Sequence, residues 1–347
     1  MPNDPPADRP PRRARYRGKN PRRFEEKYKE HEPARYSDTI AKVLASGKTP
    51  VGSHRPIMVA EVLAALDPKP GEIAVDGTLG YGGHAQEILP RLQPGGRLLG
   101  LDADPIELPK TEARLSALGF DENTFTAHRT NFAGLPQLLA RRGIAAVDLI
   151  LADLGVSSMQ LDDPKRGFSL KLEGPLDLRM NPERGAPASV LLQKLSAEKL
   201  SGLFLENADE SNPALAPSLA GKTFASTRAL AHAIRAALFS RKEEEQELSV
   251  RRVFQALRIA VNDEFSALDT FLRNLPACLN PGGRVAILTF HSGEDRRVKK
   301  AFEAGLRERH YAEIATEVVR PSTEERRANP RATSAKLRWA RRTEAEG

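Results

Sequence analysis

A glycine-rich turn, DGTLGYGGH over residues 76–84, sets the architecture of this 347-residue chain. The turn follows a short apolar run at residues 73–75 and precedes helically spaced apolar residues that extend to residue 92. Its four glycines allow backbone conformations that other residues avoid and let a ligand approach the backbone closely. In open α/β sheets, a turn from strand to helix lies at the carboxyl edge of the sheet, where ligands bind. The turn therefore predicts a nucleotide-like cofactor site.

Strands and helices alternate on either side of this turn. Helical spacing covers residues 54–66, ends at a turn rich in proline and glycine, and returns at residues 106–118. This βαβα order favours an α/β fold, a Rossmann-like parallel sheet with helices on both faces. The expected strands are residues 73–75, 96–101, 124–127 and 147–152, with a further strand at 283–290.

The interval before the last strand has a different pattern. Residues 161–257 contain polar turns and stretches rich in Ala, Leu, Glu and Arg, without a convincing strand, which predicts a helical insertion. Two prolines, Pro213 and Pro217, predict an interruption of any helix over residues 205–217. The expected organisation is an extension (1–50), the first part of the sheet domain (51–160), the insertion (161–257), and the second part with a basic C-terminal tail (258–347).

Composition excludes several classes of protein. No run of apolar residues approaches the length of about 18 that a membrane span needs, so we expect no membrane association. The single cysteine, Cys278, excludes an internal disulfide framework and a cysteine-based zinc site. No signal or transit peptide is evident. A cytoplasmic location is therefore expected.

The positive charge is concentrated at the N-terminus. The chain carries a formal charge of +7, and residues 1–23 contain eight lysines or arginines against two aspartates. A basic, proline-rich segment with few aliphatic residues is expected to be disordered and attracted to polyanions such as an RNA backbone. A solubilising extension without a partner is the alternative.

An acidic residue supports the cofactor assignment. Asp102 ends the second expected strand, where a carboxylate can accept hydrogen bonds from ribose hydroxyls. The third glycine of a pyrophosphate-binding fingerprint is replaced by Ala85, which favours S-adenosylmethionine over a dinucleotide. A purely structural turn, with Asp102 as a helix cap and His84 as a packed helix-start residue, is the alternative.

The ordered motifs closely resemble the RsmH (MraW) family of cytosine-N4 methyltransferases of small-subunit ribosomal RNA, over roughly residues 53–342. The resemblance is carried by His54-x-Pro56-x-Met58, Asp76-Gly-Thr-Leu-Gly-x-Gly-Gly-His84, Asp153-Leu-Gly-Val-Ser-Ser158, Gln160-Leu-Asp162-Asp163, Arg166-Gly-Phe-Ser169, Gly174-Pro-Leu-Asp177-x-Arg179-Met180, Phe254-Gln-Ala-Leu-Arg-Ile-Ala-Val-Asn262 and Phe290-His-Ser-x-Glu-Asp-Arg296.

The resemblance implies a Rossmann-like S-adenosylmethionine methyltransferase sheet with an inserted helical domain. It also implies an enzyme that methylates N4 of a cytidine in the decoding region of 16S ribosomal RNA. The implied partner is small-subunit ribosomal RNA or the 30S particle, and the sequence leaves the oligomeric state open, a homodimer included. The implied cofactor-binding residues are Gly82, Gly83, His84, Asp102, Phe132, Asp153 and Gln160.

Two residues are candidates for catalysis. The exocyclic amine of cytosine is a poor nucleophile, so the enzyme needs an acceptor for its hydrogens and a route for the lost proton. Asp153 ends the fourth expected strand, where many amino-methyltransferases place such an acceptor, and His291 follows the last strand. The alternatives are a turn-capping carboxylate and a structural histidine. The adjacent pair Asp162 and Asp163 is a poor chelate, so no metal is expected.

Two other functions compete with this one. A non-catalytic RNA-binding protein of ribosome assembly could keep the methyltransferase fold. Residues 205–217 depart from the usual sequence of the family, which is compatible with that role. A nicotinamide-dependent oxidoreductase is disfavoured by the imperfect pyrophosphate fingerprint.

Overall fold

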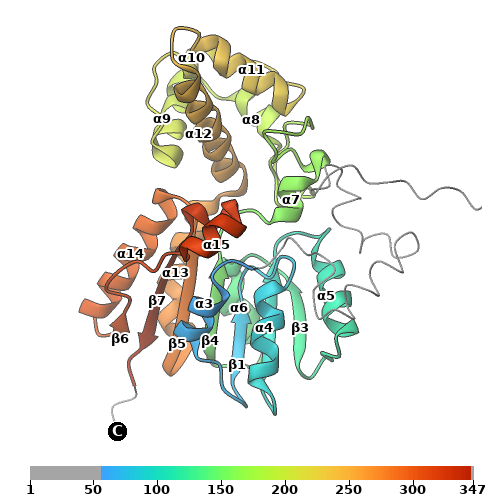
Figure 1. The fold of residues 1–347 in the computed structure, drawn as a ribbon, viewed down its shortest axis with the longest axis vertical. Helices are drawn as coiled ribbons and strands as arrows, with labels where there is room; N and C mark the ends of the chain where they lie inside the picture. The colour runs from blue at the N-terminus through green and yellow to red at the C-terminus, as the bar shows by residue number, and fades with distance from the viewer. Residues whose placement is uncertain (1–55, 345–347) are drawn as a thin grey trace, which may run out of the picture. The chain divides into compact units, whose positions relative to one another are not determined.

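The computed structural model describes residues 56–344, which are built around a seven-stranded sheet (Figure 1). The strand order is β3-β2-β1-β4-β5-β7-β6, in which β1 to β5 are parallel and β7 is antiparallel to both of its neighbours. The strands are β1 (Ile73–Asp76), β2 (Arg97–Asp102), β3 (Phe125–Arg129), β4 (Val147–Asp153), β5 (Leu279–Thr289), β6 (Tyr311–Ile314) and β7 (Lys336–Arg342).

All five strands expected from the sequence are confirmed, and so is the Rossmann-like α/β class. The boundaries differ by a few residues, most of all at β5, which begins at Leu279 instead of residue 283. The extension expected over residues 1–50 lies outside the described residues. Within residues 56–344, no helix combines the length and apolarity that crossing a membrane requires.

The basic C-terminal stretch is a correction to the sequence analysis, which described it as a tail. Strand β7 lies between β5 and β6 and is part of the sheet. Leu337 is fully buried on one face of the sheet and Ala340 on the other. The side chains of Lys336 and Arg338 both donate to Asp295, at 2.8 and 2.7 Å. Lys336 and Arg338 give β7 the composition of a solvated segment. This composition conceals the alternation of its side chains between the two faces of the sheet.

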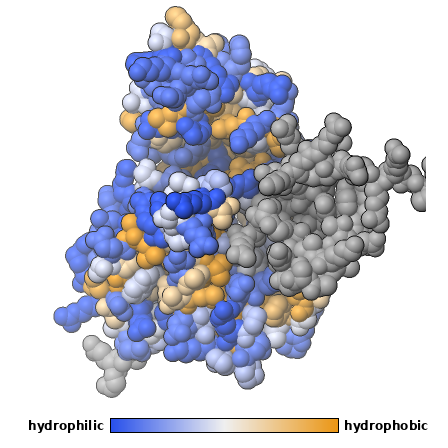
Figure 2. Space-filling view, in the orientation of Figure 1, coloured by the Kyte–Doolittle hydropathy of each residue, from blue (hydrophilic) through white to orange (hydrophobic). Residues whose placement is uncertain are grey.

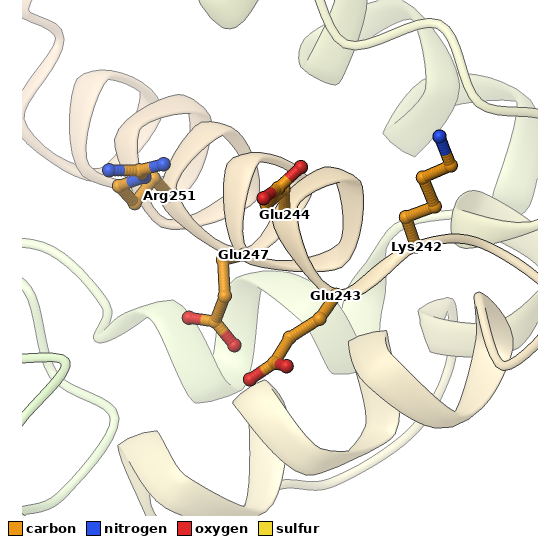
Figure 3. Close-up of a pocket in the computed structure, with 5 residues that line it drawn as sticks. All are labelled: Lys242, Glu243, Glu244, Glu247 and Arg251. Carbon is orange, nitrogen blue, oxygen red and sulfur yellow. The ribbon is translucent and has the colours of Figure 1, made fainter.

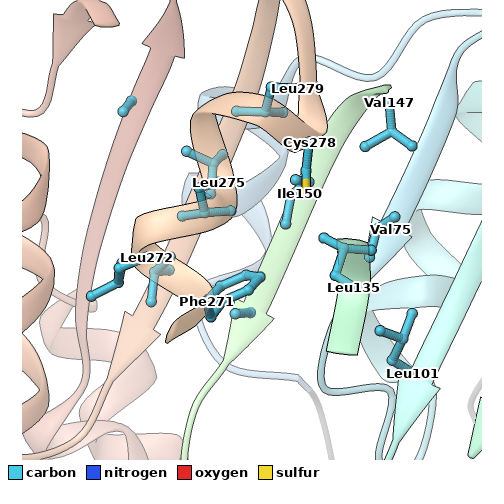
Figure 4. Packing of buried hydrophobic residues seen from close by; sticks show 14 of the residues in the cluster. Val75, Leu101, Leu135, Val147, Ile150, Phe271, Leu272, Leu275, Cys278 and Leu279 are labelled. Carbon is cyan, nitrogen blue, oxygen red and sulfur yellow. The ribbon is translucent and has the colours of Figure 1, made fainter. Parts of the chain in front are cut away.

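Helices cover both faces of the sheet. Three helices pack on one face, around a core that includes Leu66, Ile88 and Leu115. The opposite face carries three other helices around a core that includes Phe271 and Val298, part of which is shown in Figure 4. The first group is α3 (Val59–Leu66), α4 (Gly83–Leu92) and α5 (Leu108–Ala117); the second is α6 (Leu135–Arg142), α13 (Glu264–Cys278) and α14 (Ser292–Arg307).

The chain between β4 and β5 is helical and has a hydrophobic core of its own. This core contains Phe204, Leu230 and Leu257, none of which belongs to the two cores on the sheet. The expected interruption is confirmed, since α9 ends at Ala208 and α10 begins at Leu215. Whether residues 161–257 form a separate domain stays a prediction. The helices are α7 (Ser158–Asp162), α8 (Ala188–Lys194), α9 (Ala197–Ala208), α10 (Leu215–Leu219), α11 (Thr227–Ala237) and α12 (Glu243–Asn262).

Short helical turns complete the described chain. Helix α15 (Thr323–Ala328) follows β6, and its Glu325 carboxylate accepts a hydrogen bond from Met58 N at 2.8 Å, which joins it to the start of α3. The 3₁₀ turns are η2 (Phe132–Gly134), η3 (Pro164–Arg166) and η4 (Pro330–Ser334).

Candidate active site

The glycine-rich turn is fastened to the ends of two strands. Gly77 N donates to Leu151 O of β4, and Leu79 N donates to Leu101 O of β2, both at 2.8 Å. The Thr78 hydroxyl accepts from Asp153 N at 2.6 Å. The turn is therefore held at the carboxyl edge of the parallel strands, as the sequence predicts.

Gly82 is constrained by its backbone conformation and by close packing, and Gly83 by close packing. Gly82 caps α4 with φ of 77°, and a Cβ atom there would lie 3.0 Å from Cγ2 of Thr111. A Cβ atom at Gly83 would lie 3.1 Å from Cγ of Pro56. A side chain would be strained and crowded at Gly82 and crowded by Pro56 at Gly83, so the backbone can meet a ligand only on the side away from these neighbours.

Three acidic side chains end adjacent parallel strands. Asp76 ends β1, Asp102 ends β2 and Asp153 ends β4. Asp76 is buried, and burial raises its pKa to about 6 even though its carboxylate accepts from Thr78 N at 3.1 Å. Burial likewise raises the pKa of Asp102 to about 6. This edge therefore concentrates negative charge that is only partly compensated, which suits a cationic ligand.

Asp102 already carries part of the local structure. Its two carboxylate oxygens accept from Gly80 N and Asp104 N, each at 2.8 Å. A carboxylate has about four acceptor positions, so two remain for hydroxyl donors. Asp102 thus has a structural role, but it is not the helix cap that the sequence left as an alternative, since Glu107 caps α5, and it keeps capacity for a ribose.

His84 and Asp153 face each other beside the turn. Their Nε2 and Oδ2 atoms are 3.6 Å apart, which is too long for a good hydrogen bond. Among the described residues, His84 Nε2 and Asp153 Oδ1 are buried polar atoms without a hydrogen-bond partner. Because buried polar groups are nearly always paired, these atoms fit a site that is completed by a ligand.

Phe132 and Gln160, the remaining predicted cofactor residues, flank the same edge. Phe132 begins η2, and its Cβ lies 3.3 Å from where a Cβ on Gly77 would be. The Gln160 amide accepts from Ser157 N at 2.9 Å and donates to the Asp104 carboxylate at 2.8 Å. One amide hydrogen of Gln160 is left for a ligand, because a primary amide carries two.

His291 has a clear structural role. It caps α14, with Nδ1 accepting from Glu294 N at 3.4 Å, and its Nε2 lies 3.1 Å from Glu294 Oε1. Burial alone would raise the pKa of Glu294, but His291 and the Arg258 guanidinium hold that pKa below its usual range. Among the described residues no hydrogen bond or ion pair joins His291 to Asp153, although Asp153 ends β4 and His291 follows the neighbouring strand β5. Its catalytic role stays a prediction.

The sequence analysis missed two buried acids. It quoted Asp76 only as the first residue of the turn, yet this carboxylate is as buried as the core around it. It did not consider Asp104, which is 1% exposed and forms a 2.8 Å ion pair with Arg166. The spacing of Asp104 two residues after Asp102 was the available signal, because such an aspartate readily forms side-chain turns before a helix.

Other polar groups near these motifs are paired within the chain. Asp177 and Arg179, which belong to one of the family motifs, form an internal bidentate ion pair at 2.7 Å. Asp162 binds Arg331 at 2.8 Å. In the part of the chain that the structure describes, no group of three or more His, Cys, Asp or Glu residues is arranged to hold a metal ion.

A separate pocket lies at the start of α12, distant in sequence from every predicted site residue. It has a volume of about 450 Å³, and the side chains that line it carry charges of both signs (Figure 3). Glu247 in this pocket is paired with Arg235 of α11. This mixture offers neither an apolar surface for a cofactor nor a positive one for RNA. Its lining residues are Lys242, Glu243, Glu244, Glu247 and Arg251.

A sheet in which β7 lies antiparallel between β5 and β6, with a glycine turn after β1 and acids at the ends of β1, β2 and β4, is the arrangement of an S-adenosylmethionine-dependent methyltransferase. The model of the MraW methylase family matches residues 52–343, and the chain belongs to that family. The resemblance noted in the sequence is thereby confirmed, and the nicotinamide alternative is not favoured.

Curated relatives agree with this assignment. The chain is 50% identical to ribosomal RNA small subunit methyltransferase H 2 of Alkaliphilus metalliredigens, over 95% of this chain and 97% of that protein. It is 48% identical to ribosomal RNA small subunit methyltransferase H 1 of Lachnoclostridium phytofermentans, over 95% and 92% of the two chains. The corresponding protein of Agathobacter rectalis is 46% identical, over 96% and 98%.

Proposed function

We propose that this enzyme transfers a methyl group from S-adenosylmethionine to N4 of a cytidine in the decoding region of 16S ribosomal RNA. The observation that carries the chemistry is the unpartnered, buried Oδ1 of Asp153 beside the glycine turn. The choice of substrate rests on the names of the relatives, which are small-subunit ribosomal RNA methyltransferases. Small-subunit RNA or the 30S particle, in the cytoplasm, is the proposed partner. A homodimer stays a prediction.

The predicted cofactor-binding residues would each contact a different part of the ligand. S-adenosylmethionine supplies a methyl group on a sulfonium, which is an electrophile that needs no further activation. The backbone at Gly82 and Gly83 and the side chain of His84 would hold it beside the turn, and the lone pairs left on Asp102 would accept from ribose hydroxyls. Phe132 and the remaining amide hydrogen of Gln160 would complete the pocket. The raised pKa values of Asp76 and Asp102 suit a cationic ligand, since its charge would stabilise both carboxylates.

Asp153 would act on the nucleophile. A carboxylate that accepts a hydrogen bond from the cytosine amine draws the amine into line with the methyl group and localises its lone pair. The hydrogen bond from Asp153 N to the Thr78 hydroxyl holds the Asp153 backbone at the end of β4. The position from which the carboxylate extends is therefore fixed. His84, 3.6 Å away, is placed to share the proton that the amine loses.

The target base has to leave its stack to reach this buried edge, which is easiest in an irregular or single-stranded region of RNA. Much of the surface that is coloured in Figure 2 is hydrophilic, with orange apolar patches between the blue areas. RNA binding through such a surface and the basic N-terminal segment should weaken as salt concentration rises.

The test is mass mapping of modified nucleosides in small-subunit RNA from cells with and without the gene. Loss of N4-methylcytidine at one position of the decoding region, restored by the wild-type gene but not by the Asp153→Asn variant, is the expected result. Persistence of the mark in the deletion strain would reject the proposed substrate. An Asp153→Asn gene that restores the mark would instead reject the catalytic role of Asp153.

A further inference from the structure

A buried ion pair stands behind the predicted cofactor residues. Arg166 and Asp104 are 6% and 1% exposed, and Arg166 NH1 donates to Asp104 Oδ2 at 2.8 Å. Gln160 Nε2 donates to the same oxygen at 2.8 Å. Isolated buried charges are strongly unfavourable, so removing either partner would leave the other uncompensated.

The acidic partner is connected to the ribose candidate. Asp104 N donates to Asp102 Oδ1 at 2.8 Å, and Asp104 Oδ1 accepts from Ile106 N at 2.9 Å. The Asp104 carboxylate thus fixes the chain that follows β2 and the Gln160 amide together. The Asp102 carboxylate keeps unused capacity as a hydrogen-bond acceptor, and the Gln160 amide keeps one unused donor hydrogen.

The other side of the guanidinium reaches the loop before α8. Arg166 NH2 donates to Met180 O at 2.8 Å, and Met180 N in turn donates to Asn262 Oδ1 at 2.7 Å. The same loop carries Glu183, which pairs with Arg129 at the end of β3. Arg129 is the register partner of Asp102 in the sheet. The loop is therefore anchored next to the strand ends that carry the ribose candidate.

We propose that Arg166 is a positioning residue for cofactor binding, acting through Asp104 to hold Gln160 and Asp102 in their binding orientation and tying both to the loop at Met180. This inference rests on the proposed function only in taking S-adenosylmethionine as the ligand. It is independent of the RNA target. A guanidinium suits the role because it can donate to the Asp104 carboxylate and to the Met180 carbonyl at once. A lysine ammonium is a compact point charge and lacks this forked geometry.

The experiment measures S-adenosylhomocysteine binding by calorimetry and steady-state kinetics on the full chain. Arg166→Met alone would leave the buried Asp104 carboxylate without its ion-pair partner. The main variant is therefore Arg166→Met with Asp104→Leu, because an apolar pair can replace a buried ion pair without loss of stability. We expect its dissociation constant to rise about tenfold, the effect of losing about 1.4 kcal/mol of binding. The kcat at saturating cofactor should stay within about threefold of wild type, since the lost interaction is made in the ground state as well.

A matched control is available at the opposite edge of the sheet. Arg284 and Glu72 also form an ion pair, here through two hydrogen bonds of 2.7 and 3.0 Å, and Arg284 also donates to a backbone carbonyl, that of Leu66. Arg284→Met with Glu72→Leu should leave the dissociation constant unchanged. Arg166→Lys should give an intermediate affinity, since lysine can keep the contact with Asp104 but cannot reach the Met180 carbonyl at the same time.

The outcomes separate the two proposals. Failure of the wild-type protein to bind S-adenosylhomocysteine would reject the proposed function itself. A folded Arg166→Met, Asp104→Leu variant with wild-type affinity, or one that loses kcat without losing affinity, would overturn the positioning role. An equal loss of affinity in the Arg284 and Glu72 control would show that the effect is one of general stability.

Discussion

His84 Nε2 and Asp153 Oδ2 lie 3.6 Å apart, across the gap between the start of α4 and the end of β4. Each side chain is largely buried, and each has a polar atom without a partner among the described residues. The two groups are close enough to share a proton through a small shift, yet neither is committed to the other. Such an arrangement is expected where a substrate supplies the missing partner.

Replacing Asp153 should abolish methylation while leaving the fold intact. In Asp153→Asn, the amide can donate toward the amine instead of accepting from it, so we expect kcat to fall by about 10²-fold or more, in the range of lost general-base catalysis. Asp148→Asn is the matched control, because Asp148 is at the other end of β4 and accepts from Ile73 N and Asn280 Nδ2. Single-turnover assays check this, and equal losses in the two variants would count against a catalytic role for Asp153.

Gly82→Ala should damage cofactor binding beyond its effect on stability. Gly82 and Gly143 both cap helices with positive φ, of 77° and 64°, so alanine at either should cost about 1–2 kcal/mol of backbone strain. Only at Gly82 does the new methyl group meet a neighbour, Thr111, at 3.0 Å. We expect the melting temperature of Gly82→Ala to be at least as low as that of Gly143→Ala, and weaker S-adenosylhomocysteine binding for Gly82→Ala alone. Equal affinities would show that the turn tolerates a side chain.

The buried Asp76 carboxylate should make the folded state more stable at low pH than at high pH. Burial raises its pKa from 3.8 to about 6, so the folded protein binds a proton between these values that the unfolded chain releases. The penalty for the charged form is absent below pH 3.8 and complete above pH 6, where it reaches about 3 kcal/mol at about 1.4 kcal/mol per pKa unit.

Asp76→Asn should therefore be more stable than wild type at pH 7.5 and lose this advantage as the pH approaches 4. The asparagine keeps the acceptor for Thr78 N, so the comparison isolates the charge. The same variant should bind cationic S-adenosylmethionine about tenfold more weakly, the effect of about 1.4 kcal/mol. Urea unfolding across this pH range checks the stability, and a constant difference between the two proteins would contradict the role of burial.

Asp295 should be essential for the C-terminal strand. Burial alone would raise its pKa, but Arg338 and Lys336 hold it below the usual value, so its contribution to stability is present at neutral pH and lost on acidification. Asp295→Ala leaves the Arg338 guanidinium, 8% exposed, without its partner. We expect a loss of about 3 kcal/mol in the free energy of unfolding. A variant as stable as wild type by chemical denaturation would show that β7 needs no such clamp.

Deleting residues 1–50 should weaken RNA binding and flatten its salt dependence. The eight basic residues at positions 1–23 can each neutralise a phosphate, and each such contact to single-stranded RNA contributes about 0.7 to the slope of log K against log salt concentration. Filter binding at several salt concentrations measures the slope. An unchanged slope would show that this segment makes no contact with RNA.

The sequence predicts the sheet and the turn well because their signals are local. Short apolar runs bounded by glycine and proline locate β1 to β5, and the turn at residues 76–84 identifies the cofactor edge. The signal of β7 is not local: the charges of Lys336 and Arg338, beside the buried Leu337, are paired with Asp295, which is distant in sequence.

The same limit applies to the site. Residue types at strand ends suggest Asp102, Asp153 and His291, but no spacing shows that Asp102 is already accepting two backbone hydrogen bonds or that His291 caps α14. Arg166 was visible only as part of a family motif, because its hydrogen-bond partners, Asp104 and the carbonyls of Arg179 and Met180, come from two other segments. Sequence thus locates the groups that can react, whereas their availability depends on packing.

The separate core of the helices between β4 and β5 bears on how the sheet is assembled. Asp153 and Leu288 are paired neighbours in the sheet, although residues 154–278 separate their strands. Closing so long a loop from a free chain carries an entropic penalty, and such non-local pairings form slowly. Helices that collapse first around Phe204 and Leu257 would shorten the free chain that remains to be closed. The insertion would then serve as a scaffold during folding, so that its stability sets the rate at which the two halves of the sheet find each other.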